Sequence, residues 1–230
     1  MKSSPVLQPL YQQLKSRELG LTPAAAWTSY MTDSYHFTAR LAKFATLRLH
    51  NGCVNTISWS EDGRLLLSAS DDQYLIISDP FDEANPIKHR ISSGHEGNVF
   101  SARFLPETNA SSIVSCGADG SVILTDVNRP DTYGTQVFRC HNGSSYEVAV
   151  IPGDSNTFLS CGDDGCVRWY DRREKTTCTL CRDDIIVECK CSTCSIDVDT
   201  TRPWSLAVGC SDSLVRLYDM RRLNKPSSGS

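Results

Sequence analysis

The sequence predicts an all-β protein in which a four-stranded antiparallel unit is repeated about four times. Three histidines, at positions 50, 95 and 141, recur at intervals of 45 and 46 residues, and each precedes a polar turn and an alternating strand. An Asp in a turn is followed seven residues later by a second Asp in four places: Asp72 and Asp79, Asp119 and Asp126, Asp164 and Asp171, and Asp212 and Asp219. A period of this length is typical of repeat proteins whose units stack on one another.

An extension, residues 1–43, precedes the repeats. Apolar residues at roughly helical spacing occupy residues 23–44, and Trp27, Tyr30 and Met31 are among them. Pro23 suits the first position of a helix. We therefore expect a partly helical extension, which in the simplest interpretation caps the repeats.

The repeat region, residues 44–222, contains the same short strands in each unit. One strand type comprises "RLLLSAS", "SSIVSCG", "NTFLSCG" and "WSLAVGC", and the next comprises "YLIISD", "SVILTD", "CVRWYD" and "LVRLYD". Asp119-Gly120 and Asp164-Gly165 favour tight hairpin turns, because both central positions of such turns need positive φ. A further strand, as in "TQVFRC", leads to the next unit. The units span about 50–94, 95–140, 141–180 and 181–222, and we expect a disordered tail over 223–230.

The composition restricts the class of protein. The net charge of −4 gives no support to direct nucleic-acid binding, and no apolar stretch is long enough to span a membrane. The first residues lack the apolar core of a signal peptide, so we expect nuclear and cytoplasmic localisation. In that setting the eleven cysteines are expected to be free thiols or metal ligands rather than disulfides. The sequence has no phosphate-binding loop and no Gly-x-Ser-x-Gly or His-Glu-x-x-His motif, so no enzyme activity is predicted.

The period and the repeated Asp resemble those of the WD-repeat family of β-propellers. The resemblance implies that a hydrogen-bonded tetrad of His, Ser or Thr, turn Asp and strand Trp holds each blade. It maps to His50, Ser68 and Asp72 in the first unit, to His95, Ser115, Asp119 and Thr125 in the second, and to His141, Ser160, Asp164 and Tyr170 in the third. The fourth unit has Asp212 and Tyr218 but no His, and Ser78 replaces the aromatic residue in the first, so weaker tetrads are expected there. Because the set recurs in successive units, it is structural and not a hydrolase triad.

Two consecutive units end in W/Y-D-x-R, at Tyr170–Arg173 and at Tyr218–Arg221. This ending resembles the substrate receptors of Cullin-4 RING ubiquitin ligases. "RELGL" and "TFLSCGDDGCVRWYDRR" are most similar to the nuclear receptor interaction protein subgroup of those receptors. The resemblance implies a non-enzymatic receptor whose propeller and residues 23–44 bind the ligase's damaged-DNA-binding adaptor. The client would be a nuclear receptor or another transcription factor. The implied adaptor-binding residues are Asp164, Asp171, Arg173, Asp212, Asp219 and Arg221.

Two other interpretations stay open. In one interpretation, each Arg of these endings serves only its own blade, by pairing with the adjacent Asp. The chain as a whole would then be a generic WD-repeat scaffold of a chromatin or transcription co-regulator complex.

The cysteines offer a separate alternative. Cys178-x-x-Cys181 and Cys191-x-x-Cys194 form a pair of motifs typical of zinc sites, and a zinc enzyme or redox protein could be built on them. The residues between the motifs occupy the place of a blade's outer strand, which would hold the motifs apart. The resemblance also implies no metal and no other cofactor. We therefore expect free thiols at these positions.

Four units are fewer than the roughly seven blades that such propellers usually need to close. Residues 44–50, "FATLRLH", could pair with the incomplete last unit to close a four-bladed ring. Blades shaped for a wider ring disfavour that closure. We therefore expect an open arc with an unpaired edge, self-association of the chain, and further blades in the complete protein.

Overall fold

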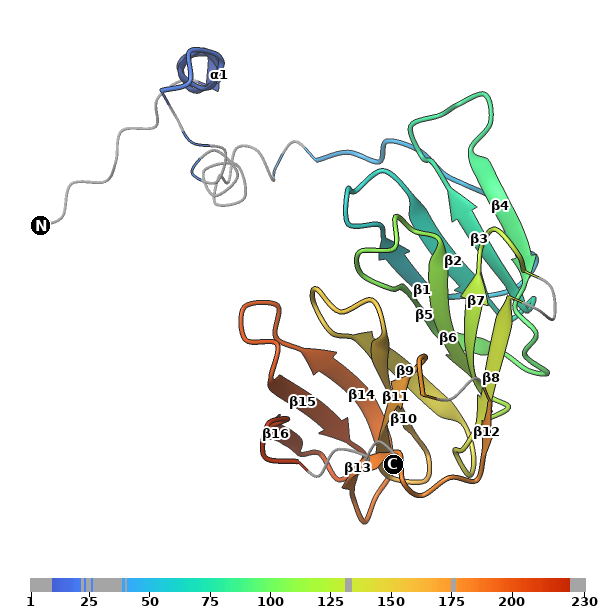
Figure 1. Ribbon diagram of the computed structural model, residues 1–230. Coiled ribbons are helices and arrows are strands. Elements are labelled where there is room, and N and C mark those ends of the chain that lie inside the picture. The colour runs from blue at the N-terminus through green and yellow to red at the C-terminus, as the bar shows by residue number, and fades with distance from the viewer. Residues whose placement is uncertain are drawn as a thin grey trace, which may run out of the picture. The chain divides into compact units, whose positions relative to one another are not determined.

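The computed structural model describes residues 10–21, 23, 26, 39, 41–130, 134–174 and 177–223. The chain divides into two units, Met1–Thr46 and Leu47–Ser230 (Figure 1). No helix in the described part of the chain is long and apolar enough to cross a membrane.

The described part of the first unit contains one regular element, helix α1 (Leu10–Glu18). Its residues are mostly good helix formers, and Lys15 and Arg17 lie in the last turn, where they complement the helix dipole. The helix ends in a Schellman motif: Gly20 has φ +69° and donates to the carbonyl of Arg17, and Leu21 donates to that of Ser16. The helix predicted over 23–44 falls largely outside the described residues, Trp27, Tyr30 and Met31 included, and stays a prediction.

The second unit consists of four successive antiparallel sheets, as the repeat predicts (Figure 1). Sheet one contains β1 (Val54–Trp59), β2 (Leu66–Ser70), β3 (Tyr74–Ser78) and β4 (Ile87–Ser92). Sheet two contains β5 (Val99–Phe104), β6 (Ser112–Gly117), β7 (Val122–Asp126) and β8 (Thr135–Arg139). Sheet three contains β9 (Ser145–Val150), β10 (Thr157–Gly162), β11 (Cys166–Asp171) and β13 (Ile185–Glu188). Sheet four contains only β14 (Thr193–Val198), β15 (Ser205–Cys210) and β16 (Val215–Asp219).

One short strand breaks the simple repeat. Strand β12 (Cys178–Thr179) follows β11 along the chain but pairs in parallel with β8 at the edge of sheet two. The chain then returns to sheet three as β13, which pairs with β11. The sequence predicts β13 as an outer strand, and the structure confirms it. The excursion through β12 is not predicted.

The hairpin turns explain the repeated Asp-Gly. Gly120 and Gly165 have φ values of +72° and +76°, but Asp119 and Asp164 do not have positive φ. The predicted turn with positive φ at both positions of Asp-Gly is therefore wrong, and only the Gly takes the left-handed conformation. A Cβ atom at Gly165 would lie 2.5 Å from the carbonyl oxygen of Cys189, so only glycine fits that turn. Gln73 and Ser213 occupy the equivalent left-handed positions of sheets one and four at some steric cost.

The core lies between adjacent sheets, in three apolar clusters. One joins sheets one and two around Leu67 and Ile113, the next joins sheets two and three around Phe138 and Phe158, and the last joins sheets three and four around Leu206. The first strands of neighbouring sheets, β1, β5, β9 and β14, lie side by side. This is the stacking of propeller blades, in which each unit buries a face only against its neighbours.

The four sheets do not close into a ring. Among the described residues, no strand joins β16 to β1, and residues 44–50 form no strand, so the open arrangement is confirmed. The two terminal sheets expose apolar side chains, at 60% for Ile57 and 50% for Trp59 on β1 and at 73% for Val215 and 75% for Leu217 on β16. An inner sheet would cover such residues with the next blade.

Candidate functional site

The tetrad of sheet three is complete. The ring Nδ1 of His141 donates to Asp164 at 2.9 Å, and its Nε2 accepts from the hydroxyl of Ser160 at 2.6 Å. The hydroxyls of Ser160 and Tyr170 lie 3.4 Å apart. These groups tie the turn, the middle strand and the strand β11 of one blade together.

The tetrads of sheets one and two contain the same His–Asp and His–Ser bonds. His50 is 3.0 Å from Asp72 and 2.8 Å from Ser68, and His95 is 3.0 Å from both Asp119 and Ser115. Among the described residues, neither of these two tetrads has a fourth member equivalent to Tyr170 of sheet three. The buried hydroxyl of Thr125 has no hydrogen-bond partner among the described residues, so its assignment to the tetrad is wrong. In sheet two Ser121 instead lies within hydrogen-bond distance of His95 and Asp119, and the sequence analysis did not single it out.

Sheet four replaces the histidine by an arginine. Asp212 pairs with Arg216, four residues later, at 3.0 Å between Oδ1 and Nη1. Arg216 hydrogen-bonds Asp212 and lowers the pKa of that carboxyl to about 2. Both side chains are about one-third exposed, so this pair is weaker than the buried tetrads.

Burial excludes the tetrads as hydrolase triads. Ser160 is fully buried and His141 is 7% exposed, so no substrate reaches the hydroxyl. Burial raises the pKa of Asp164, but hydrogen bonds from His141, Cys166 and Asn142 outweigh it and lower that pKa to about 2. The carboxylate is therefore ionised at neutral pH and fixed in place.

The W/Y-D-x-R endings of sheets three and four adopt the same geometry; we call them the arginine boxes, Tyr170–Arg173 and Tyr218–Arg221. In the first, Asp171 Oδ1 accepts from the backbone N–H and the Nε–H of Arg173, both at 2.9 Å, and Oδ2 accepts from Nη2. In the second, Asp219 accepts from Arg221 in the same way, at 3.1, 2.9 and 2.6 Å. Each Arg thus pairs with the Asp of its own blade.

Both arginines remain exposed despite this pairing. The side chain of Arg173 is 65% exposed and that of Arg221 is 63% exposed. The guanidinium of Arg221 also lies over the ring of Trp204, 4.7 Å from its centroid, a contact that the sequence analysis did not anticipate. Asp pairing uses the Nε side of each guanidinium, which leaves the opposite edge available to a second acceptor.

The turn aspartates lie away from the arginine boxes. Asp164 precedes β11 and Arg173 follows it, so the six-residue strand separates them by about 20 Å. Asp212 and Arg221 flank β16 in the same manner. The six residues assigned to adaptor binding therefore form two groups at opposite ends of the blades, and only Asp171, Arg173, Asp219 and Arg221 are brought together in pairs.

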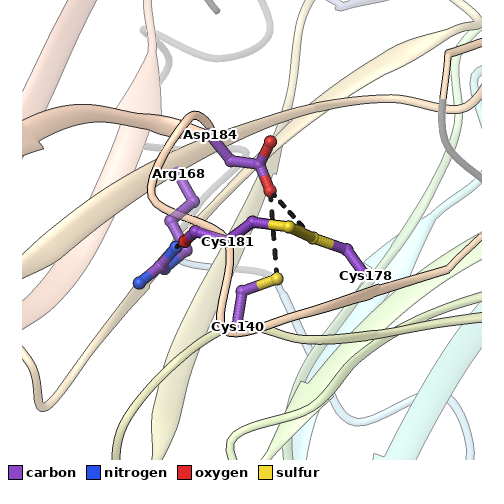
Figure 2. The surroundings of a disulfide bond; sticks show 5 residues. All are labelled: Cys140, Arg168, Cys178, Cys181 and Asp184. Carbon is purple, nitrogen blue, oxygen red and sulfur yellow. Dashed lines mark hydrogen bonds between the residues drawn. A yellow bond between two sulfur atoms is a disulfide. The ribbon is translucent and has the colours of Figure 1, made fainter.

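The expectation of free thiols holds for Cys191 and Cys194 and is wrong for Cys178 and Cys181. Cys178 and Cys181 form a disulfide, because the turn between them brings their Cα atoms to 6.4 Å (Figure 2). The sulfurs of Cys191 and Cys194 do not join this pair: Cys191 lies near Cys210 and Asp212, and Cys194 is exposed. The alternative zinc site built on both motifs is therefore not formed by these four residues.

Comparison with known proteins identifies the repeat. The WD domain, G-beta repeat family matches residues 42–79, 87–126 and 134–171. The chain is 44% identical to DDB1- and CUL4-associated factor 6 of Homo sapiens over 224 residues, which cover 96% of this chain and 26% of that protein. It is 35% identical to WD and tetratricopeptide repeats protein 1 of Homo sapiens over 85% of this chain and 28% of that protein. It is 38% identical to WD repeat protein iqw1 of Schizosaccharomyces pombe over 76% of this chain and 23% of that protein. The chain thus spans about a quarter of the length of these relatives.

Proposed function

Since the chain belongs to the WD domain, G-beta repeat family, we propose that it is a non-enzymatic scaffold that acts as a substrate receptor of a CUL4 ubiquitin ligase. In this proposal the chain binds the ligase adaptor DDB1 through Arg173 and Arg221 of the arginine boxes. The client would be a transcription factor such as a nuclear receptor.

One observation carries the proposal: the arginine boxes hold two arginines in the same pose at the ends of equivalent strands of consecutive blades. The backbone N–H and the side chain of each Arg both bond the neighbouring Asp, so the guanidinium is oriented before any partner arrives. Pre-orientation lowers the entropy lost when such a side chain is immobilised in an interface.

The chemistry of the boxes suits a protein partner. A guanidinium bonded to Asp on one edge can bond carboxylates or backbone carbonyls with the other, and Arg is enriched in the energetically dominant parts of interfaces. The stacking of Arg221 on Trp204 adds an apolar surface beside the charge. Sheets one and two have no corresponding Arg, because Phe81 and Asn128 occupy the positions of the arginines.

The comparisons support the same partner. A relative whose name associates it with DDB1 and CUL4 is 44% identical over 96% of this chain. The proposal extends the association in that name to the present chain.

Affinity purification from cells tests the proposal against the alternative of a generic scaffold. The tagged chain is expressed and its co-purifying proteins are identified by mass spectrometry. We expect DDB1 and a CUL4 cullin among them. Recovery of chromatin or transcription co-regulator subunits without DDB1 would instead support the generic scaffold.

A further inference from the structure

Three cysteines and an aspartate gather between sheets two and three. One ligand atom from each of Cys140, Cys178, Cys181 and Asp184 can be chosen so that all lie within 4.8 Å of one another. Cys140, Cys178 and Asp184 are at most 6% exposed, and Cys181 is half-buried. Figure 2 shows the sulfur of Cys140 and the disulfide sulfurs facing the carboxylate of Asp184, whose Oδ2 lies 3.8 Å from Cys140 Sγ and 3.4 Å from Cys178 Sγ.

The path of the chain brings this cluster together. Cys140 follows the end of β8, Cys178 belongs to β12 on the edge of the same sheet, and Asp184 directly precedes β13 in sheet three. The excursion that the chain makes through β12 therefore places ligands from two blades around one point. A group bound there would fasten the loop between β11 and β13 to the neighbouring blade.

The turn between the two bonded cysteines is held in an unusual conformation. Leu180 has φ +53°, in the left-handed region that a bulky residue seldom adopts, and its N–H donates to the carbonyl of Arg139 at 3.1 Å. Leu180 is also 73% exposed, so burial of its side chain does not account for the conformation. Backbone strain of this kind collects at ligand-binding sites, and here it directs the side chains of Cys178 and Cys181 toward the same point.

The charges around the cluster suit a cation bound by thiolates. Asp184 places a carboxylate in a buried environment. Arg168, itself 5% exposed, donates from Nη1 to the backbone carbonyl of Cys181 at 2.6 Å (Figure 2). Three thiolates and one carboxylate would carry four negative charges, of which a divalent cation offsets two. Without a cation, burying that charge would be strongly unfavourable.

We propose that the reduced protein binds one zinc ion through Cys140, Cys178, Cys181 and Asp184. Structural zinc is usually bound by four ligands in tetrahedral geometry, most often by Cys and His, and Asp oxygen is also a known ligand. Zn–S distances of about 2.3 Å give S···S distances of about 3.8 Å. The spacing of the cluster is close to this once the disulfide opens. Thiolate ligands favour zinc over calcium or magnesium.

Zinc binding and the disulfide exclude each other. A thiol reductant such as glutathione supplies two electrons and two protons to the Cys178–Cys181 bond and is itself oxidised to its disulfide. Zinc then displaces the protons of the three thiols into solvent. The Cys178–Cys181 disulfide accordingly belongs to the oxidised form of the protein.

Zinc content of the reduced full chain tests the proposal. The chain is treated with a phosphine reductant, mixed with one equivalent of zinc sulfate, desalted against a weak chelator and analysed by mass spectrometry for metal. We expect one zinc per chain. Cobalt in place of zinc should give the intense visible bands of tetrahedral coordination and a thiolate charge-transfer band. A reduced chain that retains no metal would overturn the proposal.

Matched variants identify the ligands. Cys181→Ser and Asp184→Asn each remove one ligand and should weaken zinc binding at least about 100-fold, because even indirect partners of a metal ligand contribute 10–100-fold. Cys194→Ser, the equivalent change in the exposed second motif, should leave zinc binding unchanged. Far-UV circular dichroism of each variant checks that it is folded. Full zinc binding by folded Cys181→Ser and Asp184→Asn, or loss of zinc in folded Cys194→Ser, would refute the assignment.

Discussion

Replacement of Asp164 by Ala should destabilise the repeat region, because this carboxylate is the acceptor on which the tetrad of sheet three depends. It accepts from His141 Nδ1 at 2.9 Å, from two backbone N–H groups at 3.1 and 3.2 Å, and from Arg168 Nη2 at 3.4 Å. The side chains of His141 and Arg168 are 0% and 6% exposed, so water cannot readily replace the lost acceptor.

The magnitude follows from the groups left without an acceptor. A buried donor that loses its partner costs about 1–3 kcal/mol. The two donors of His141 and Arg168 together give a loss of about 2–6 kcal/mol in the free energy of unfolding. For a chain of this size that corresponds to a fall in Tm of about 4–24 °C.

Asp212→Ala is the matched control, since Asp212 is the turn aspartate of sheet four and its partners are the partly exposed Arg216, a backbone N–H and the thiol of Cys191. It should lower the Tm much less than Asp164→Ala does, because solvent screens an exposed pair. Thermal unfolding of both variants, followed by calorimetry and far-UV circular dichroism, gives the comparison. Equal Tm shifts for the two variants, or an unchanged Tm for Asp164→Ala, would refute the role assigned to the tetrad.

Three further predictions concern acid, the open edges and the extension. The pKa of Asp164 is lowered to about 2 in the folded protein, against an ordinary value of 3.8, so the stabilisation that this carboxylate gives is present above about pH 4 and is lost as the pH falls toward 2. The urea midpoint of unfolding should therefore fall further over that window in the wild type than in Asp164→Asn. Equal falls would contradict the assignment. The exposed apolar residues of β1 and β16 should make the chain self-associate. The double variant Trp59→Lys with Leu217→Lys should shift the chain toward monomer in light scattering, and a wild-type chain that is already a monodisperse monomer would show that this inference is wrong. Deletion of residues 1–40 should weaken binding to DDB1 while the Tm of the repeats stays unchanged, whereas a lowered Tm would favour the capping role.

The repeat was predictable because its signals are local and recur. Each hairpin needs a turn residue with positive φ, and each blade repeats the interval between its two aspartates, so four units and the open last sheet could be inferred from spacing alone. The tetrad partners of His50, His95 and His141 followed from the resemblance to WD-repeat proteins, which the repeated spacing pointed to. The assignment of Thr125 to the tetrad was wrong, since its buried hydroxyl has no hydrogen-bond partner among the described residues.

Other features depend on contacts that spacing does not encode. Strand β12 has two residues and pairs with a strand about 40 positions earlier, so no periodic pattern marks it. The grouping of Cys140 with Cys178 and Cys181 depends on that pairing and was missed for the same reason. Helix α1 has few apolar residues, so no apolar periodicity marks it in the sequence. The sequence also left open whether Arg173 pairs with Asp171, because that pairing depends on the geometry of the side chains.

The affinity of the purified chain for DDB1 tests the central claim most directly, when it is measured for two double variants of equal charge. Arg173→Ala with Arg221→Ala removes both guanidinium groups of the arginine boxes. Arg172→Ala with Arg222→Ala removes the neighbouring arginines from the same two turns. We expect the first pair to weaken binding at least about 30-fold, since a central interface Arg contributes about 2 kcal/mol or more, and the second pair to change it by less than about threefold. Equal affinities of the two double variants, with unchanged melting curves, would contradict the claim that the arginine boxes bind the adaptor.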